Sequence, residues 1–100
     1  MPESNMLNLA ILISGSGTTL QNLIDRINDK TLNANIQIVI SSAPDTHGIK
    51  RAEQNSIPVA IVERKGFDNS DNFSNTIINE IEKYSVDLII LAGFLHLFKI

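Results

Sequence analysis

An apolar run of strand length that ends at a glycine-containing turn constrains the fold of this chain more than any other feature. Residues 7–14 are LNLAILIS, and the turn Ser14-Gly15-Ser16-Gly17 follows directly. Beyond it, apolar side chains recur at i, i+3, i+4 and i+7, the stripe of an amphipathic helix, at Leu20, Leu23, Ile24 and Ile27. The pattern predicts a buried strand that turns tightly into a helix. Thr18 and Gln21 have the spacing of a capping box at its start.

The same alternation of strand and helix continues to the end of the chain. Further strands are expected at 36–41, 59–62 and 88–92, and a second helix near His47, which Asp45 is suited to begin. A third helix is indicated by residues that share one helical face: Phe73, Ile77, Ile78, Ile81 and Tyr84. The order βαβαβαβ predicts an α/β fold, a parallel sheet with helices on both faces. With right-handed crossovers we expect the strand order 3-2-1-4.

Composition bounds the kind of protein this is. With 100 residues, 43% of them hydrophobic and 19% charged, the chain is long enough for one domain. A net charge of -3, without blocks of like charge, argues against nucleic-acid and membrane-surface partners. Zero Cys excludes disulfides and a thiol nucleophile, and two His are too few for most metal sites, so no metal is predicted. No apolar run approaches the ~20 residues of a membrane span, and we expect a cytoplasmic location.

The last predicted strand raises the question of whether the sheet is complete. Residues 88–92 form the most apolar run, and the chain ends eight residues later at Ile100. An apolar strand at a sheet edge invites pairing with another strand. Two interpretations stay open: the sheet is incomplete at its C-terminal side, or an intact small domain pairs through the strand 4 edge.

The turn after the first strand is the first candidate site, because parallel sheets bind ligands beyond the carboxyl ends of their strands. Small residues and free amides at a helix start attract an anion. A dinucleotide fingerprint is disfavoured, since its third glycine falls at Leu20, and the Gly-Lys-Ser/Thr of a nucleotide phosphate loop is absent. A phosphomonoester fits better. In the purely structural interpretation, Gly15 and Gly17 make a tight turn and Thr18 caps a helix.

The second candidate segment is 92–98, at the end of the last strand. In the order 3-2-1-4, the first and last strands are neighbours, so both loops face one crevice. His96 is a candidate proton carrier or an ordinary packed residue, and His47 is interpreted as structural. Apolar residues of this segment line either a ligand pocket or a core: Leu95, Leu97 and Phe98. The loop after the third strand, with Arg64, Phe67 and Ser70, lies at the same edge. No acid pair or Ser-His-Asp triad has recognisable spacing, so no catalytic residue is predicted.

Three segments in this order resemble the phosphoribosylglycinamide formyltransferase family: 12–21 (LISGSGTTLQ), 39–42 (VISS) and 86–94 (VDLIILAGF). The resemblance runs from about Asn8 to Phe98. It implies a Rossmann-like formyltransferase fold, with residues 1–100 as the N-terminal nucleotide-binding part of its domain. The implied reaction is formyl transfer from 10-formyltetrahydrofolate to the amine of glycinamide ribonucleotide, a step of purine synthesis.

The resemblance also implies site residues. Gly15, Gly17, Thr18 and Thr19 match the loop that holds the substrate phosphate, and Leu95 matches a substrate contact. The positions that match folate contacts are Ser70, His96, Leu97 and Phe98. Thr18-Thr19 stands where the family commonly has Ser-Asn, and Ser70 and His96 stand where it has Arg, which leaves cofactor specificity open.

The catalytic Asn, His and Asp of that family lie beyond the matching region, and we expect this chain alone to be inactive. Two alternatives stay open. One is a noncatalytic α/β phosphate-ligand-binding or assembly module. The other is a related formyltransferase with a different acceptor, which the departures at Thr19 and His96 keep in view.

Overall fold

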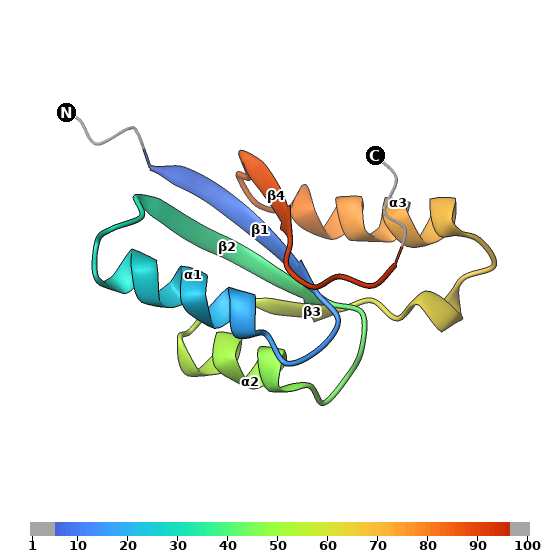
Figure 1. Ribbon diagram of the computed structural model, residues 1–100. Coiled ribbons are helices and arrows are strands. Elements are labelled where there is room, and N and C mark those ends of the chain that lie inside the picture. Colours follow the sequence, from blue (N-terminus) through green and yellow to red (C-terminus); the bar gives the residue numbers. More distant parts are fainter. Residues whose placement is uncertain (1–5, 97–100) are drawn as a thin grey trace.

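Four parallel strands form a sheet in the order β3-β2-β1-β4 (Figure 1). The computed structural model describes residues 6–96. The strands are β1 (Leu7–Ile13), β2 (Ala34–Ser41), β3 (Val59–Ile61) and β4 (Leu88–Leu91). The predicted strand order and parallel arrangement are therefore confirmed. In this order β1 lies between β2 and β4, so its carboxyl end adjoins the ends of both neighbours.

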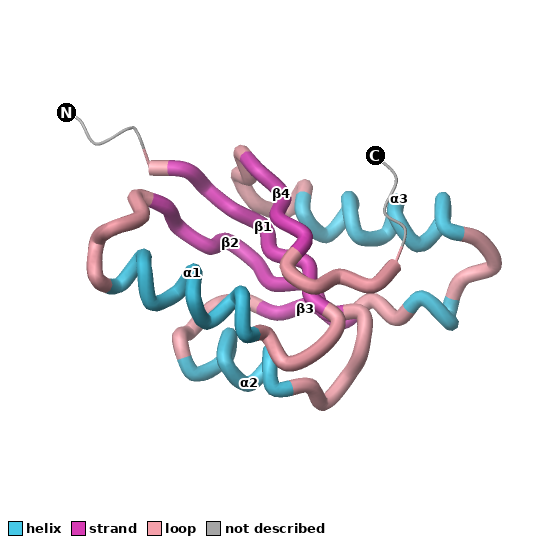
Figure 2. Tube along the Cα trace, in the orientation of Figure 1, coloured by secondary structure: helices cyan, strands magenta, loops and turns pink. Residues whose placement is uncertain are grey.

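Helices cover both faces of the sheet, as the alternation of strands and helices predicts (Figures 1 and 2). The helices are α1 (Thr18–Asn28), α2 (His47–Gln54) and α3 (Ser70–Ile81), with a short 3-10 turn η1 (Arg64–Gly66). Helices α1 and α2 contribute buried residues to the core on one face, and α3 to the core on the other. None of the helices within residues 6–96 is long and apolar enough to cross a bilayer.

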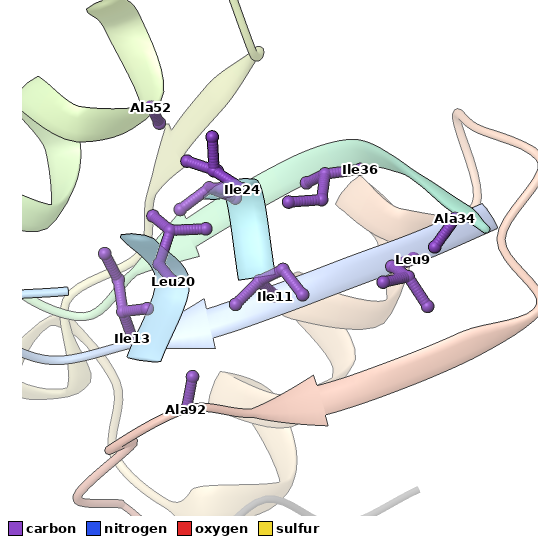
Figure 3. Close-up of a cluster of buried hydrophobic side chains, with 10 residues drawn as sticks. Leu9, Ile11, Ile13, Leu20, Ile24, Ala34, Ile36, Ala52 and Ala92 are labelled. Atoms are coloured by element: carbon purple, nitrogen blue, oxygen red, sulfur yellow. The ribbon is translucent and has the colours of Figure 1, made fainter. Parts of the chain in front are cut away.

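The central strand β1 is buried on both faces, which explains its nearly continuous apolar sequence. Successive side chains of a strand point to opposite faces. Leu9, Ile11 and Ile13 therefore join the α1 side of the core, while Ala10 and Leu12 join the α3 side. Figure 3 shows the first of these clusters, where side chains from β1, α1 and β2 meet.

The pairing of β1 with β2 contains a register shift, which changes the face of the sheet to which the following β2 side chains point. Leu9 pairs with Ile36 and Ala10 pairs with Ile38, so Gln37 is an extra residue in β2. At this extra residue the alternation of β2 side chains between the two faces of the sheet is interrupted. As a result Ile36 and Ile38 lie in cores on opposite faces of the sheet, although their spacing of two would place them on the same face of a regular strand.

Some predicted boundaries and caps were wrong. The strand predicted from Ile36 begins earlier, at Ala34. Helix α2 has Thr46, not Asp45, as its N-cap, and the Thr46 side chain accepts a hydrogen bond from the Ile49 amide. Helix α3 ends at Ile81, so Tyr84 lies beyond the helix, although its side chain still packs against the same core. Boundaries move in this way because tertiary contacts outweigh local preferences at element ends.

Strand β4 is an edge strand of the described part of the chain. It pairs with β1 along one side. Leu88 and Leu91 keep 48% and 52% of their surface exposed. The expectation of an apolar edge at this strand is confirmed for residues 6–96.

Candidate functional site

The ends of β1 and β4 enclose a small cavity. Its volume is about 150 Å³, and its lining comes from the loop after β1 and the turn after β4: Gly15, Ser16, Gly17, Thr18, Thr19, Ala92 and Gly93. The two segments that the sequence places at one crevice therefore lie together. The lining residues are small and carry no charge, so an approaching ligand meets mainly backbone and hydroxyl groups.

Backbone amides at the start of α1 make this cavity suited to an anion. Gly17 is the N-cap residue, with φ 75°, and no side chain caps the helix. The first amides of an α-helix have no intrahelical carbonyl to bind. They carry the positive end of the helix dipole, which attracts phosphate or carboxylate. The glycine cap leaves these donors accessible to a ligand.

The predicted capping box is therefore wrong. Thr18 is the first residue of α1, and its hydroxyl lies 3.1 Å from the Ser16 hydroxyl. The Gln21 side chain turns away from the helix start. It donates to the Asp25 carboxylate and accepts from Arg51. A left-handed glycine at the cap position replaces the side-chain cap that the Thr-Gln spacing indicated.

Helix α2 packs closely against the loop. The Gly48 amide donates to the Gly15 carbonyl at 3.3 Å. The Arg51 Nε donates to the Ser16 carbonyl at 2.8 Å. A Cβ on Gly17 would lie 2.6 Å from the Gly48 Cα, closer than real Cβ contacts come. Two glycines thus allow the loop and α2 to meet at backbone distance.

A serine hydroxyl joins the ends of three strands. Ser14 Oγ lies 2.7 Å from the Ser42 hydroxyl, just after β2, and accepts a hydrogen bond from the Leu95 amide at 3.0 Å, beyond β4. Because Ser14 accepts from Leu95, it is free to donate its proton to Ser42. This arrangement holds the segment after β4 beside the loop after β1.

The aromatic side chains beyond β4 and on α3 form a cluster next to this segment. The Phe73 and Phe94 rings are stacked at 6.0 Å, and the His96 ring meets both edge-on, at 5.6 Å and 5.7 Å. Phe67 meets Phe73 edge-on, and the Arg64 guanidinium lies 5.9 Å from the Phe73 ring centre. His96 is therefore a half-buried member of an aromatic cluster, one of the two roles left open for it.

Within the described part of the chain, the cavity is not accompanied by a metal site. Across residues 6–96, no group of three or more His, Asp or Glu side chains is placed to hold a metal ion. The Thr31 hydroxyl and amide donate to the Asp29 carboxylate and lower the pKa of Asp29. This residue caps the C-terminal end of α1, at the opposite end of the helix from the loop.

Most of the predicted site residues lie at this end of the sheet. Four line the cavity: Gly15, Gly17, Thr18 and Thr19. The Leu95 side chain is 81% exposed, while its amide is bound to Ser14. Ser70 opens α3, one helical turn before Phe73. Leu97 and Phe98 lie outside the described residues.

Sequence reasoning missed Gly48 and Arg51, which bind the loop from α2. A glycine in the first turn of a helix is the one signal that hinted at a close approach. Nothing local distinguishes Arg51 from the other basic residues, because its partner Ser16 lies 35 positions earlier.

The fold and site together define a Rossmann-like α/β domain with a glycine-capped loop at the start of its first helix. A family model described as Formyl transferase matches residues 7–99. The chain therefore belongs to the formyl transferase family.

Individual relatives agree with this assignment. Phosphoribosylglycinamide formyltransferase of Haemophilus influenzae is 40% identical over 92 residues, covering 92% of this chain and 43% of the relative. Glycinamide ribonucleotide transformylase 1 of Symbiobacterium toebii superposes with a TM-score of 0.91 at 28% identity, over 97% of this chain and 46% of that structure. Phosphoribosylglycinamide formyltransferase of Coxiella burnetii, solved in complex with CHES, superposes with a TM-score of 0.88 at 39% identity, over 95% and 44%. The chain thus spans less than half the length of these relatives.

Proposed function

We propose that this chain is the N-terminal, phosphate-binding part of a phosphoribosylglycinamide formyltransferase. The whole enzyme would transfer a formyl group from 10-formyltetrahydrofolate to the amine of glycinamide ribonucleotide in purine synthesis, and we propose the cytoplasm as its location. The observation that carries the proposal is the cavity between the ends of β1 and β4. It occurs in a chain whose relatives are named for this reaction.

The loop after β1 would hold the phosphate of the ribonucleotide. Amides of Gly17, Thr18 and Thr19 stand at the start of α1, where anions are stabilised by free N–H donors and the helix dipole. Gly15 completes the lining without a side chain in the way. The Thr18 and Thr19 hydroxyls offer further donors. Leu95, whose amide is held by Ser14, would contact the substrate beyond its phosphate.

The formyl donor would lie along the segment after β4 and the start of α3. His96 contacts the Phe73 ring directly, and Phe73 follows Ser70 by one helical turn on α3. Aromatic rings and a hydroxyl suit a planar, polar pteridine ring. We propose contacts from His96, Leu97, Phe98 and Ser70. When bound, 10-formyltetrahydrofolate supplies the formyl group, and the residues of this chain bind and orient it.

This chain is proposed to bind rather than to catalyse. Formyl transfer without a covalent intermediate needs groups that polarise the formyl carbonyl and move a proton. Residues 1–100 hold no match to the Asn, His and Asp that the family resemblance assigns to those tasks. We therefore expect the 100-residue chain to give no turnover when it is mixed with both substrates.

Titration of the isotope-labelled chain with glycinamide ribonucleotide tests the proposal. We expect the amide signals of residues 15–19 to shift, while signals at the opposite end of α1, such as Asp29, stay in place. The corresponding riboside without phosphate is the matched control ligand, and it should bind at least ~10-fold more weakly, because the charge-assisted hydrogen bonds are lost. Absence of a shift at millimolar ribonucleotide would count against the proposal. Shifts with the folate but none with the ribonucleotide would favour a formyltransferase with a different acceptor.

The exposed edge of β4 supports a second candidate, a noncatalytic assembly module. Leu88 and Leu91 are about half exposed on a strand that forms the edge of the sheet within the described residues. Pairing through this edge predicts a stable oligomer in the absence of ligand. Light scattering that finds a monomer at high protein concentration would exclude the assembly module.

A further inference from the structure

Two successive carbonyls of the loop after β1 are bound from the same side. Helix α2 supplies both donors: the Gly48 amide binds the Gly15 carbonyl at 3.3 Å, and Arg51 Nε binds the Ser16 carbonyl at 2.8 Å. The Gly48 amide belongs to the first turn of α2, where an N–H has no carbonyl of its own helix to bind. The loop and the helix thus satisfy each other's free polar groups.

These bonds determine where the loop amides point. In a planar trans peptide, the carbonyl and the following N–H point in opposite directions. Since the Gly15 and Ser16 carbonyls face α2, the amides of Ser16 and Gly17 face away from it. Helix α2 connects β2 to β3, whereas the cavity lies between the loop and the turn after β4, across β1 (Figure 1). Both amides are therefore directed to the cavity side of the loop.

The arginine that holds the second carbonyl is itself fixed in place. Its NH1 donates to the Gln21 side chain at 3.3 Å, and Gln21 also binds Asp25. A Cβ on Gly17 would lie 3.3 Å from Arg51 Cδ, so the arginine stem lies against this glycine. A planar guanidinium can bind two acceptors in one geometry, which the single ammonium of a lysine cannot reproduce.

We propose that Arg51 is a positioning residue of the phosphate loop: it holds the Ser16 carbonyl and thereby orients the Gly17 amide toward the phosphate. The inference rests on the proposed function. Arg51 is not among the residues that line the cavity, so it acts through the loop. The Arg51 charge lies on the side of the loop opposite the cavity. There it adds to the positive potential at the start of α1.

The test compares Arg51→Ala, Arg51→Lys and Lys50→Ala in the full chain, with circular dichroism as the check on folding. Lys50 is an exposed neighbour on the same helix, and no side-chain hydrogen bond or ion pair joins it to another residue within 6–96. Its removal deletes the same charge without touching the loop. The first readout is the amide spectrum and hydrogen exchange of the free protein. The second is titration with inorganic phosphate, followed at the signals of residues 15–19.

In the free protein, Arg51→Ala should shift the Ser16 and Gly17 amide signals and accelerate their exchange, while Lys50→Ala leaves both unchanged. Phosphate binding should weaken about tenfold in Arg51→Ala and less than about twofold in Lys50→Ala, because the latter loses a screened surface charge. Arg51→Lys should recover little of the loss. Full recovery by lysine would overturn the positioning role in favour of charge alone.

The two readouts separate this inference from the proposed function. If the unaltered chain binds neither phosphate nor the ribonucleotide, the phosphate site fails, yet the free-protein spectra still decide whether Arg51 orients the loop. Unchanged Ser16 and Gly17 amides in folded Arg51→Ala would overturn the inference even if phosphate binds well. Should Arg51→Ala not fold, the Arg51→Lys spectra serve the same purpose.

Discussion

The contact between the loop after β1 and helix α2 can be measured by replacing Gly17 with alanine. Gly17 has φ 75°, and an added Cβ would lie 2.6 Å from the Gly48 Cα. The neighbouring atom belongs to the backbone, so it cannot rotate away as a side chain would. Gly17→Ala therefore combines an unfavourable backbone conformation with a steric overlap.

The two penalties have different sizes and different controls. A left-handed conformation costs an L-residue about 1–2 kcal/mol. Forcing extra volume into a packed contact adds about 1–3 kcal/mol. Gly93 also has a left-handed φ, 74°, but an added Cβ there meets nothing within 4 Å. Gly93→Ala therefore isolates the conformational term. Gly15 has neither a left-handed φ nor a neighbour within 4 Å, so Gly15→Ala is the baseline.

Urea unfolding followed by circular dichroism gives the free energy of unfolding for each variant. We expect Gly93→Ala to lie about 1–2 kcal/mol below Gly15→Ala, and Gly17→Ala to lie a further ~1–3 kcal/mol below Gly93→Ala. The gain from a less flexible unfolded chain, about 0.4–1 kcal/mol, is common to all three and cancels. For a domain of this size, each 1 kcal/mol corresponds to about 4–8 °C in Tm.

The comparison of Gly17→Ala with Gly93→Ala tests whether Gly17 and Gly48 approach each other closely. Equal free energies of unfolding would mean that α2 yields to the new methyl group without cost, and the close approach of Gly17 to Gly48 would then be refuted. A Gly15→Ala variant as unstable as Gly17→Ala would refute the assignment of the strain to one position in the loop.

Four further substitutions test other parts of the structure. Asn69→Ala should lower the free energy of unfolding by about 1 kcal/mol, because its side chain caps α3. Thr18→Ala, which removes no cap, should change the free energy of unfolding by less than ~0.5 kcal/mol. If urea unfolding gave Thr18→Ala the same loss as Asn69→Ala, the predicted capping box at α1 would be supported after all. Phe73→Ala should cost about 3–5 kcal/mol, since the ring is fully buried, and a Tm lowered by only a few degrees would argue against its central place. Ser14→Ala should cost about 1–3 kcal/mol and speed hydrogen exchange at the Leu95 amide, whose acceptor is lost. An unchanged exchange rate would show that this bond does not hold the segment.

Hydrophobic periodicity was sufficient to predict the succession of strands and helices along the chain. The continuous apolar run of β1 requires burial on both faces, and right-handed crossovers between parallel strands are compatible with the order that is observed. That order places the ends of β1 and β4 side by side, so the location of the candidate site was predictable as well. These features follow from local patterns and from general rules of chain geometry.

The details that shape the site came only from the tertiary structure. Gln37 is polar and unremarkable in the sequence, yet the register shift at this residue decides which core receives Ile36 and which receives Ile38. The helix cap was misjudged because a Thr-Gln spacing promises a capping bond, while packing against Gly48 favours the left-handed Gly17 instead.

The sequence by itself determined the topology and the end of the sheet at which a ligand would bind, because periodicity and connection length are local properties of the chain. The tertiary structure decided how the loop presents its amides. That orientation depends on Gly48 and Arg51, which bind the loop from helix α2. Contacts between segments more than 30 residues apart depend on where the folded chain brings them together, and no local pattern records that.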